Sequence, residues 1–180
     1  MRKGDIAGWC TAVLLLSGAA MAAPPPRQSA VTRGIDEPNL WSLGFDLGEP
    51  SGVTVKKWLG GSEALDFNVG FYAPGVRFSG DYLFGLAQLM RDRSTLNLDV
   101  YVGVGPMVGF LYGGCGFSGF GRYCGNGEIY VGARVPIGVE AVFKTAPVAI
   151  GLEVAPGFAI ASFGPAGLVD FVLTLRLLLR

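Results

Sequence analysis

The chain has 180 residues, of which 51% are hydrophobic and only 16% charged, and its formal net charge is zero. This length suits one domain with its own core, and the charged fraction lies below the ~25% of a typical soluble domain. A neutral chain without a basic run gives no indication of a nucleic-acid partner. The sequence contains no histidine, which excludes a Ser-His-Asp triad and a histidine general base.

The first 22 residues have the features of a secretory signal peptide. A basic pair precedes an apolar run, and Ala20-Met21-Ala22 is typical of a cleavage site. We therefore predict a signal peptide over residues 1–22 and a flexible, proline-rich leader over residues 23–39. Residues 40–180 then form the folded domain.

The first half of the folded domain predicts four strands, because apolar residues alternate with polar or small ones. Leu40–Gly48 is followed by a turn that contains Pro50, and Val53–Leu59 ends at two glycines. The adjacent lysines of this second segment require one of them to face outward, or a bulge. The next two strands cover Glu63–Tyr72 and Val76–Met90, with a Pro-Gly turn between them.

The second half predicts four more strands. In Leu96–Gly105, every even position is Leu or Val, and the odd positions hold Asn, Asp, Tyr or Gly. The alternation returns in Ile129–Phe143, Val148–Val154 and Val169–Leu177. Short connections in meander order indicate an antiparallel sheet, and only the segment from about Phe110 to Glu128 is much longer.

Composition decides which face of these strands points inward. The polar face carries Gly, Ala, Ser, Asn and single charges rather than the Lys and Glu of a water-exposed surface, and the chain has only four lysines. Small residues suit the narrow interior of an eight-stranded barrel. The sequence therefore predicts an all-β, eight-stranded antiparallel up-and-down transmembrane β-barrel with a polar, plugged interior. The alternative is a soluble β-protein whose apolar face forms the core.

Ten charged residues fall on the inward face of this predicted barrel. Because isolated buried charges are costly, we expect them to pair and fill the lumen. The alternative is a selective ion path along the same residues. The predicted lumen network consists of Asp46, Asp66, Arg77, Asp81, Asp99, Arg134, Glu140, Glu153, Asp170 and Arg176.

Aromatic residues near the strand ends favour the membrane interpretation. Trp41, Phe84 and Phe143 fall at one rim, and Phe71, Phe78 and Phe158 fall near the other, as interfacial girdles require. Their alternative role is core packing. Trp58 does not fit simply, since its parity places it inward unless its strand is bulged.

The long segment from Phe110 to Glu128 contains Cys115 and Cys124. Two cysteines in an exported chain favour a disulfide, because two thiols without histidine leave a zinc site incomplete. The segment also presents aromatic side chains that suit binding of a partner or a surface glycan. Alternatively, the aromatics fold back over the barrel mouth. These candidate contact residues are Tyr112, Phe117, Phe120 and Tyr123.

Three segments carry a resemblance to a known class of proteins. The predicted barrel resembles the small eight-stranded outer-membrane barrels of the OmpA and OmpX transmembrane type. More narrowly, "LGFDLGEPSGVTVKKWL", "ALDFNVGF" and "VGARVPIGVEAVF…LEVAPGF" resemble an uncharacterised bacterial family of predicted barrels. The resemblance implies a bacterial outer-membrane protein with both termini in the periplasm. Such barrels usually end in an aromatic residue, whereas this chain ends in "LRLLLR".

Together these observations predict an integral outer-membrane protein with a structural or surface-interaction role. We expect no catalysis, no cofactor and no metal. The expected partners are outer-membrane lipid and an extracellular ligand bound through residues 110–128, and the expected state is a monomer. Two other functions remain open at this point: a narrow ion or solute channel, and a soluble exported lipid binder of lipocalin type.

Overall fold

The computed structural model describes residues 40–73, 75–91, 96–118, 121–125, 127–143, 145–162 and 164–179. The predicted signal peptide and leader lie outside the described residues. Within these ranges, no helix has the length and apolar character needed to span a membrane.

The described chain is almost entirely β-strand, because the alternating segments predicted from the sequence do form strands. Most strands are longer than predicted. Their bounds are β1 (Trp41–Glu49), β2 (Ser51–Gly60), β3 (Glu63–Tyr72), β4 (Gly75–Arg91), β5 (Leu96–Leu111), β6 (Gly114–Ser118), β7 (Gly121–Gly125), β8 (Glu128–Arg134), β9 (Ile137–Phe143), β10 (Val148–Ala161) and β11 (Gly164–Leu179).

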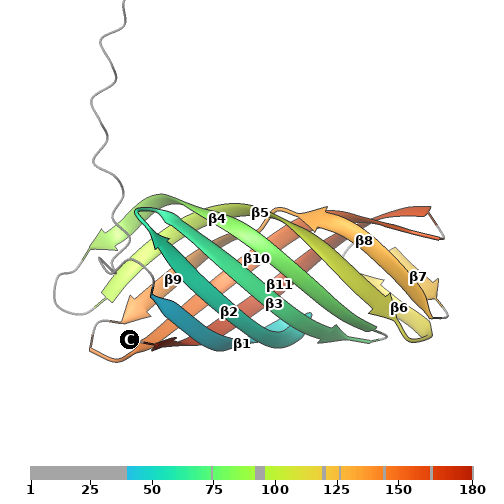
Figure 1. Cartoon of the computed structure of the whole chain (residues 1–180), viewed down its shortest axis with the longest axis horizontal. Helices are drawn as coiled ribbons and strands as arrows, with labels where there is room; N and C mark the ends of the chain where they lie inside the picture. Colours follow the sequence, from blue (N-terminus) through green and yellow to red (C-terminus); the bar gives the residue numbers. More distant parts are fainter. Residues whose placement is uncertain are drawn as a thin grey trace, which may run out of the picture.

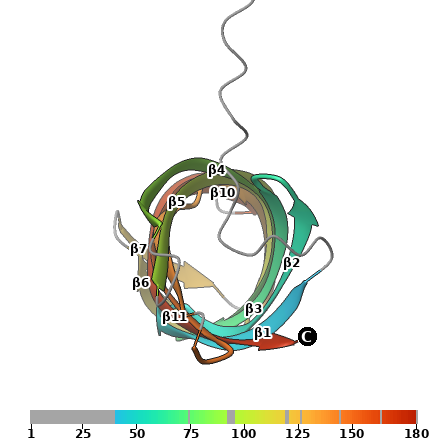
Figure 2. The same ribbon diagram turned by 90° about the vertical axis from the view of Figure 1, so that its left-hand side faces the viewer.

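Nine of these strands form one antiparallel sheet that closes in a ring (Figures 1 and 2). The ring closes because β11 pairs with β10 on one side and with β1 on the other. β8 and β9 lie end to end, since both pair with β5 and with β10. The nine strands therefore occupy eight positions around the ring.

The prediction of one continuous strand over Ile129–Phe143 is wrong at Val135 and Pro136, where β8 ends and β9 has not begun. A proline has no backbone N–H to donate to a neighbouring strand. The break is bridged by two backbone hydrogen bonds: Gly103 N donates to Pro136 O (2.7 Å), and Val135 N donates to Pro156 O (2.8 Å). The inward–outward alternation runs through the break unchanged.

The predicted long loop also differs from the structure. β5 extends to Leu111, and the following segment forms a hairpin of β6 and β7 as a separate two-stranded sheet. The hairpin contacts β11 and lies at one end of the ring (Figure 1). We call this the hairpin end. The opposite end, where Trp41 pairs with Leu179, is called the terminal end.

The ring has an apolar outer face and a layered interior. Most of the exposed large apolar side chains belong to outward positions of the strands. Inside, a polar middle lies between two apolar clusters, one toward each end. The cluster at the terminal end contains Leu40, Trp58, Ala64, Leu83, Tyr101, Val142, Ala149 and Leu178. The cluster at the hairpin end contains Met107, Leu111, Tyr130, Ala159 and Leu168.

β2 resolves the ambiguity left by its adjacent lysines. Lys56 and Trp58 are buried inside the ring, and Lys57 lies opposite Trp41 at the terminal end. A bulge follows at Trp58–Gly60, after the alternation has already placed Lys56 inward.

Candidate functional site

The ten predicted lumen residues all lie inside the ring, and none is more than 8% exposed. The structure brings most of them into two ion-pair clusters, each centred on one arginine. We call them the Arg176 cluster and the Arg134 cluster.

The Arg176 cluster lies toward the terminal end. Arg176 binds Asp66 through Nη2 and Glu140 Oε1 through Nη1, the latter at 2.9 Å. Lys56 Nζ contacts the other oxygen of Glu140 at 2.6 Å, and Thr54 Oγ1 donates to Asp66 Oδ1 at 2.7 Å. A planar guanidinium suits this role because its donors reach several carboxylates at once.

Aromatic rings surround the ammonium group of this cluster. Lys56 Nζ lies 4.9 Å from the ring centroids of both Trp58 and Tyr101, a distance typical of cation–π contacts. The apolar cluster at the terminal end therefore also contributes to holding the lysine charge.

The Arg134 cluster lies toward the hairpin end. Arg134 binds Asp81 through Nε and Nη2, and its Nη1 lies 3.2 Å from Asp170 Oδ2. Arg77 Nη2 contacts the same Asp170 oxygen at 2.6 Å. Glu153 completes the cluster, with Oε1 3.6 Å from Arg134 Nη2.

Neutral groups connect the two clusters. The Tyr101 hydroxyl donates to Glu153 Oε2 (2.8 Å), and Thr174 Oγ1 donates to Asp46 Oδ1 (2.8 Å). In the amide orientation that satisfies its neighbours, Asn68 donates to Asp46 (2.7 Å) and accepts from Arg134 Nη2 (3.1 Å). The interior is thus one continuous polar network.

Asp99 sits beside the Arg176 cluster. It lies opposite Glu140 in the β5–β9 register and is 4% exposed. Two acidic residues directly across a strand pair repel each other. The cations bound to Glu140 therefore also offset the repulsion between Glu140 and Asp99.

The described interior holds more acids than cations. Seven buried acidic residues accompany four buried cationic ones, so a fully ionised interior carries three net negative charges by difference. The acids are Asp46, Asp66, Asp81, Asp99, Glu140, Glu153 and Asp170, and the cations are Lys56, Arg77, Arg134 and Arg176.

Sequence reasoning missed several members of the network. The sequence does not decide between Lys56 and Lys57 and gives no signal for Thr54, although Lys56 and Thr54 share the parity of Trp58 on β2. The alternation assigns Tyr101 to the polar face of its strand but predicts no role for it. A hydrogen-bonding function for Tyr101 was signalled by its position two residues after Asp99.

The predicted loop contacts are only partly described. Tyr112 is 72% exposed at the hairpin end. Phe117 and Tyr123 belong to β6 and β7, but their side chains lie outside the described residues, as does all of Phe120. The backbone register places Cys115 directly opposite Cys124.

The charged residues of the outer face lie only at its rims, as far as side chains are described. Glu49 ends β1 and Glu63 begins β3. The third such residue is Lys57, whose Nζ lies 4.9 Å from the centroid of the Trp41 ring at the terminal end. Between the rims, the described outer face carries no charge.

Comparisons with known proteins give no match to a protein-family model, a curated protein or a solved structure. The resemblance to small outer-membrane barrels therefore stays a prediction. Within the described residues, no group of three or more His, Cys, Asp or Glu side chains is placed to hold a metal ion.

Proposed function

We propose that this chain is an integral bacterial outer-membrane β-barrel with eight strand positions, a plugged polar interior and a structural or surface-interaction role. The observation that carries the proposal is the distribution of charge. Ten predicted acids and arginines, together with Lys56, are buried inside the ring, whereas the described outer face between the rims has none. Soluble β-proteins show the opposite arrangement.

The cost of exposing the outward apolar side chains to water supports this assignment. Phe45, Leu152 and Leu173 are each between two-fifths and two-thirds exposed, and many outward Leu, Ile, Val and Phe side chains resemble them. Removing one such side chain from water is worth about 1.5–3 kcal/mol. Lipid around the ring would remove all of these outward apolar side chains from water and so gain this free energy for each of them.

The aromatic side chains also support a membrane location. Trp41 and Phe84 are exposed toward the terminal end, and Phe71 and Phe158 are exposed toward the hairpin end. Amphipathic or aromatic rings at both rims are typical of outer-membrane barrels. We assign the terminal end to the periplasm and the hairpin end to the cell exterior, with export through the predicted signal peptide.

The interior favours a structural role over the alternatives. The ion pairs cross the ring, and apolar clusters lie at both ends of the polar network. An ion path requires these pairs to open, and a lipocalin-type carrier requires an apolar cavity rather than buried charges.

The test is to express the full chain in a Gram-negative bacterium and fractionate the envelope. We expect the protein in the outer-membrane fraction, resistant to carbonate extraction, and migrating faster on an unheated gel than on a heated one. Recovery in the soluble periplasmic fraction without heat-modifiable migration would overturn the proposal.

A further inference from the structure

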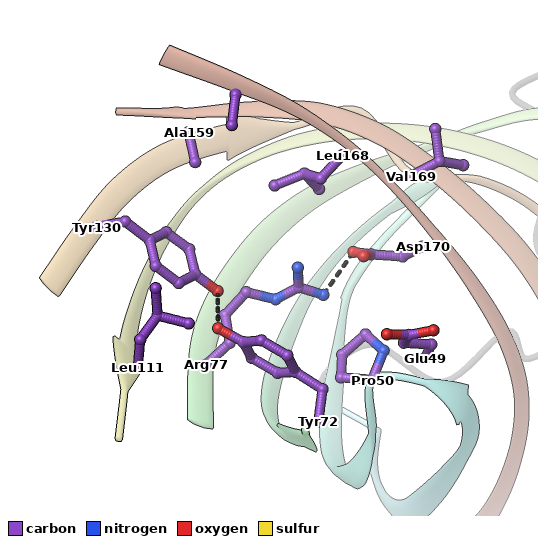
Figure 3. Close-up of a pocket in the computed structure, with 11 residues that line it drawn as sticks. Glu49, Pro50, Tyr72, Arg77, Leu111, Tyr130, Ala159, Leu168, Val169 and Asp170 are labelled. Carbon is purple, nitrogen blue, oxygen red and sulfur yellow. Dashed lines mark hydrogen bonds and ion pairs between the residues drawn. The ribbon is translucent and has the colours of Figure 1, made fainter. Parts of the chain in front are cut away.

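A hollow opens at the hairpin end, directly beyond the Arg134 cluster. Apolar side chains line most of it, including Pro50, Leu111, Ala166 and Leu168. The hydroxyls of Tyr72 and Tyr130 meet along one side at 2.8 Å (Figure 3). Its cavity volume is about 40 Å³, and about 530 Å³ when the open mouth is counted. A bound molecule can therefore place only a small group at the floor, and the rest of it lies in the mouth.

The wall of the ring is incomplete beside this hollow. β1 stops at Glu49, opposite Phe171, whereas β11 continues toward the hairpin end and pairs there with β10. Glu49 is exposed, and it lines the hollow together with Val169. The residues at the end of β1, rather than a further pair of strands, therefore border the hollow on this side.

Arg77 supplies hydrogen-bond donors at the floor of the hollow. Its side chain is buried, only 5% exposed, and Nη2 contacts Asp170. Within the described part of the chain, Nε and Nη1 have no hydrogen-bond partner. Figure 3 shows the second terminal nitrogen pointing toward Leu168, away from Asp170. These two nitrogens open onto the hollow, so an acceptor atom of a bound molecule can reach them there.

The surrounding charges decide which acceptor fits. Asp170, Asp81 and Glu153 already outnumber Arg77 and Arg134 in this cluster, and Glu49 adds a carboxylate at the rim. An anionic ligand would increase this surplus of negative charge. A neutral acceptor, such as a carbonyl oxygen, satisfies the guanidinium without doing so.

We propose that the hollow at the hairpin end binds a small, mostly apolar molecule through one neutral hydrogen-bond acceptor, which accepts from Arg77. The apolar part of the ligand lies between Leu111, Leu168 and Pro50, and the acceptor faces the guanidinium. This site is separate from the contacts of the exposed loop. It does not depend on which side of a membrane the hairpin end faces.

The test uses acetophenone as the probe, titrated into the full folded chain in detergent micelles. NMR spectra record the Arg77 Nε–H signal and the methyl signals of Leu111 and Leu168. We expect saturable shifts at all three residues. Ethylbenzene, which has the ring but no acceptor, is expected to bind about tenfold more weakly, the effect of losing a hydrogen bond to a charged group.

Two variants separate occupation of the hollow from partition into the micelle. Ala166→Leu narrows the hollow and should abolish the shifts, whereas Ala133→Leu, which does not line the hollow, should leave them unchanged. Neither variant touches the ion pairs, and the same spectra report whether each one folds.

Four results would each overturn the proposal. The first is no saturable shift at Arg77 with acetophenone. The second is equal binding of ethylbenzene and acetophenone. The third is retention of binding in Ala166→Leu. The fourth is tighter binding of benzoate, which would show that the site prefers an anion.

Discussion

The inner and outer faces of the same strands differ more in polarity than any two segments of the chain do. On β10, Leu152 is 57% exposed and its neighbour Glu153 is 7% exposed. On β11, Leu175 is 48% exposed and its neighbour Arg176 is 2% exposed. Polarity therefore changes across one peptide bond rather than between regions of the sequence. The comparison teaches that an apolar outer face and a charged interior alternate along each strand, and the proposed membrane location rests on this arrangement.

The largest expected effect comes from removing the charge at the centre of the Arg176 cluster. Arg176→Met leaves Asp66 without its arginine and deprives Glu140 of one of its two cationic partners. Breaking a buried ion pair in this way costs about 3–5 kcal/mol. Urea-induced unfolding in phospholipid vesicles measures the loss.

Lys56→Met is the matched comparison for this variant. Glu140 keeps its contact with Arg176 when Lys56 is removed, so the loss of stability should be smaller than for Arg176→Met. Equal stability of Arg176→Met and the wild type would contradict the assigned network.

The next effect concerns the outer face. Leu152→Arg places a charge within the apolar band of β10, where it lies opposite Val139 and Leu173. In a lipid bilayer this change should destabilise the fold by about 2–4 kcal/mol. The same vesicle assay measures it.

Tyr112→Arg is the control for the outer-face prediction. Tyr112 is exposed at the hairpin end, just after β5, where an added charge meets water. Its stability should match the wild type. If Leu152→Arg were equally harmless, the outer face would not be in contact with lipid.

A smaller effect is expected where the two clusters join. Tyr101→Phe removes the hydroxyl that donates to Glu153 and retains the ring beside Lys56. Hydrogen bonds to charged groups contribute about 1.5–3 kcal/mol. Unfolding of Tyr101→Phe and of the nearby outward control Val102→Ile should differ by about this amount, and no difference would remove Tyr101 from the network.

The smallest effect on the ring comes from the hairpin cysteines. Residues directly opposite in an antiparallel pair have Cα atoms about 4.5–5.5 Å apart, within the range that a disulfide bridges. We predict a Cys115–Cys124 disulfide, detected as a mass gain of two hydrogens on reduction. Cys115→Ser should change the stability of the ring by less than about 1 kcal/mol, because β6 and β7 form a separate sheet. Free thiols at both positions in the exported protein would contradict the disulfide.

Much of the fold follows from period-two alternation, because a strand needs only a consistent difference between its two faces. The same rule located Asp81, Arg134 and Asp170 in the interior by parity alone. It does not report interruptions such as Pro136, which keeps the alternation while removing a backbone donor. Nor does it choose partners: that Arg77 and Arg134 share one Asp170 oxygen depends on the stagger of β4, β8 and β11.

The apolar clusters inside the ring show another limit of the sequence. Leu83, Met107 and Leu168 occupy inward positions, yet a single apolar residue on a polar face gives little signal by itself. The hollow at Arg77 was also beyond sequence reasoning, because it depends on β1 ending at Glu49 while β11 continues.

The most direct test of the central claim is to measure which methyl groups contact lipid acyl chains. In vesicles or nanodiscs, nuclear Overhauser effects from lipid methylene protons should reach Leu152, Leu173 and Leu175, but not the inward Leu83. Acyl-chain contacts at Leu83, or water contacts in place of lipid contacts at Leu152 and Leu173, would contradict the account.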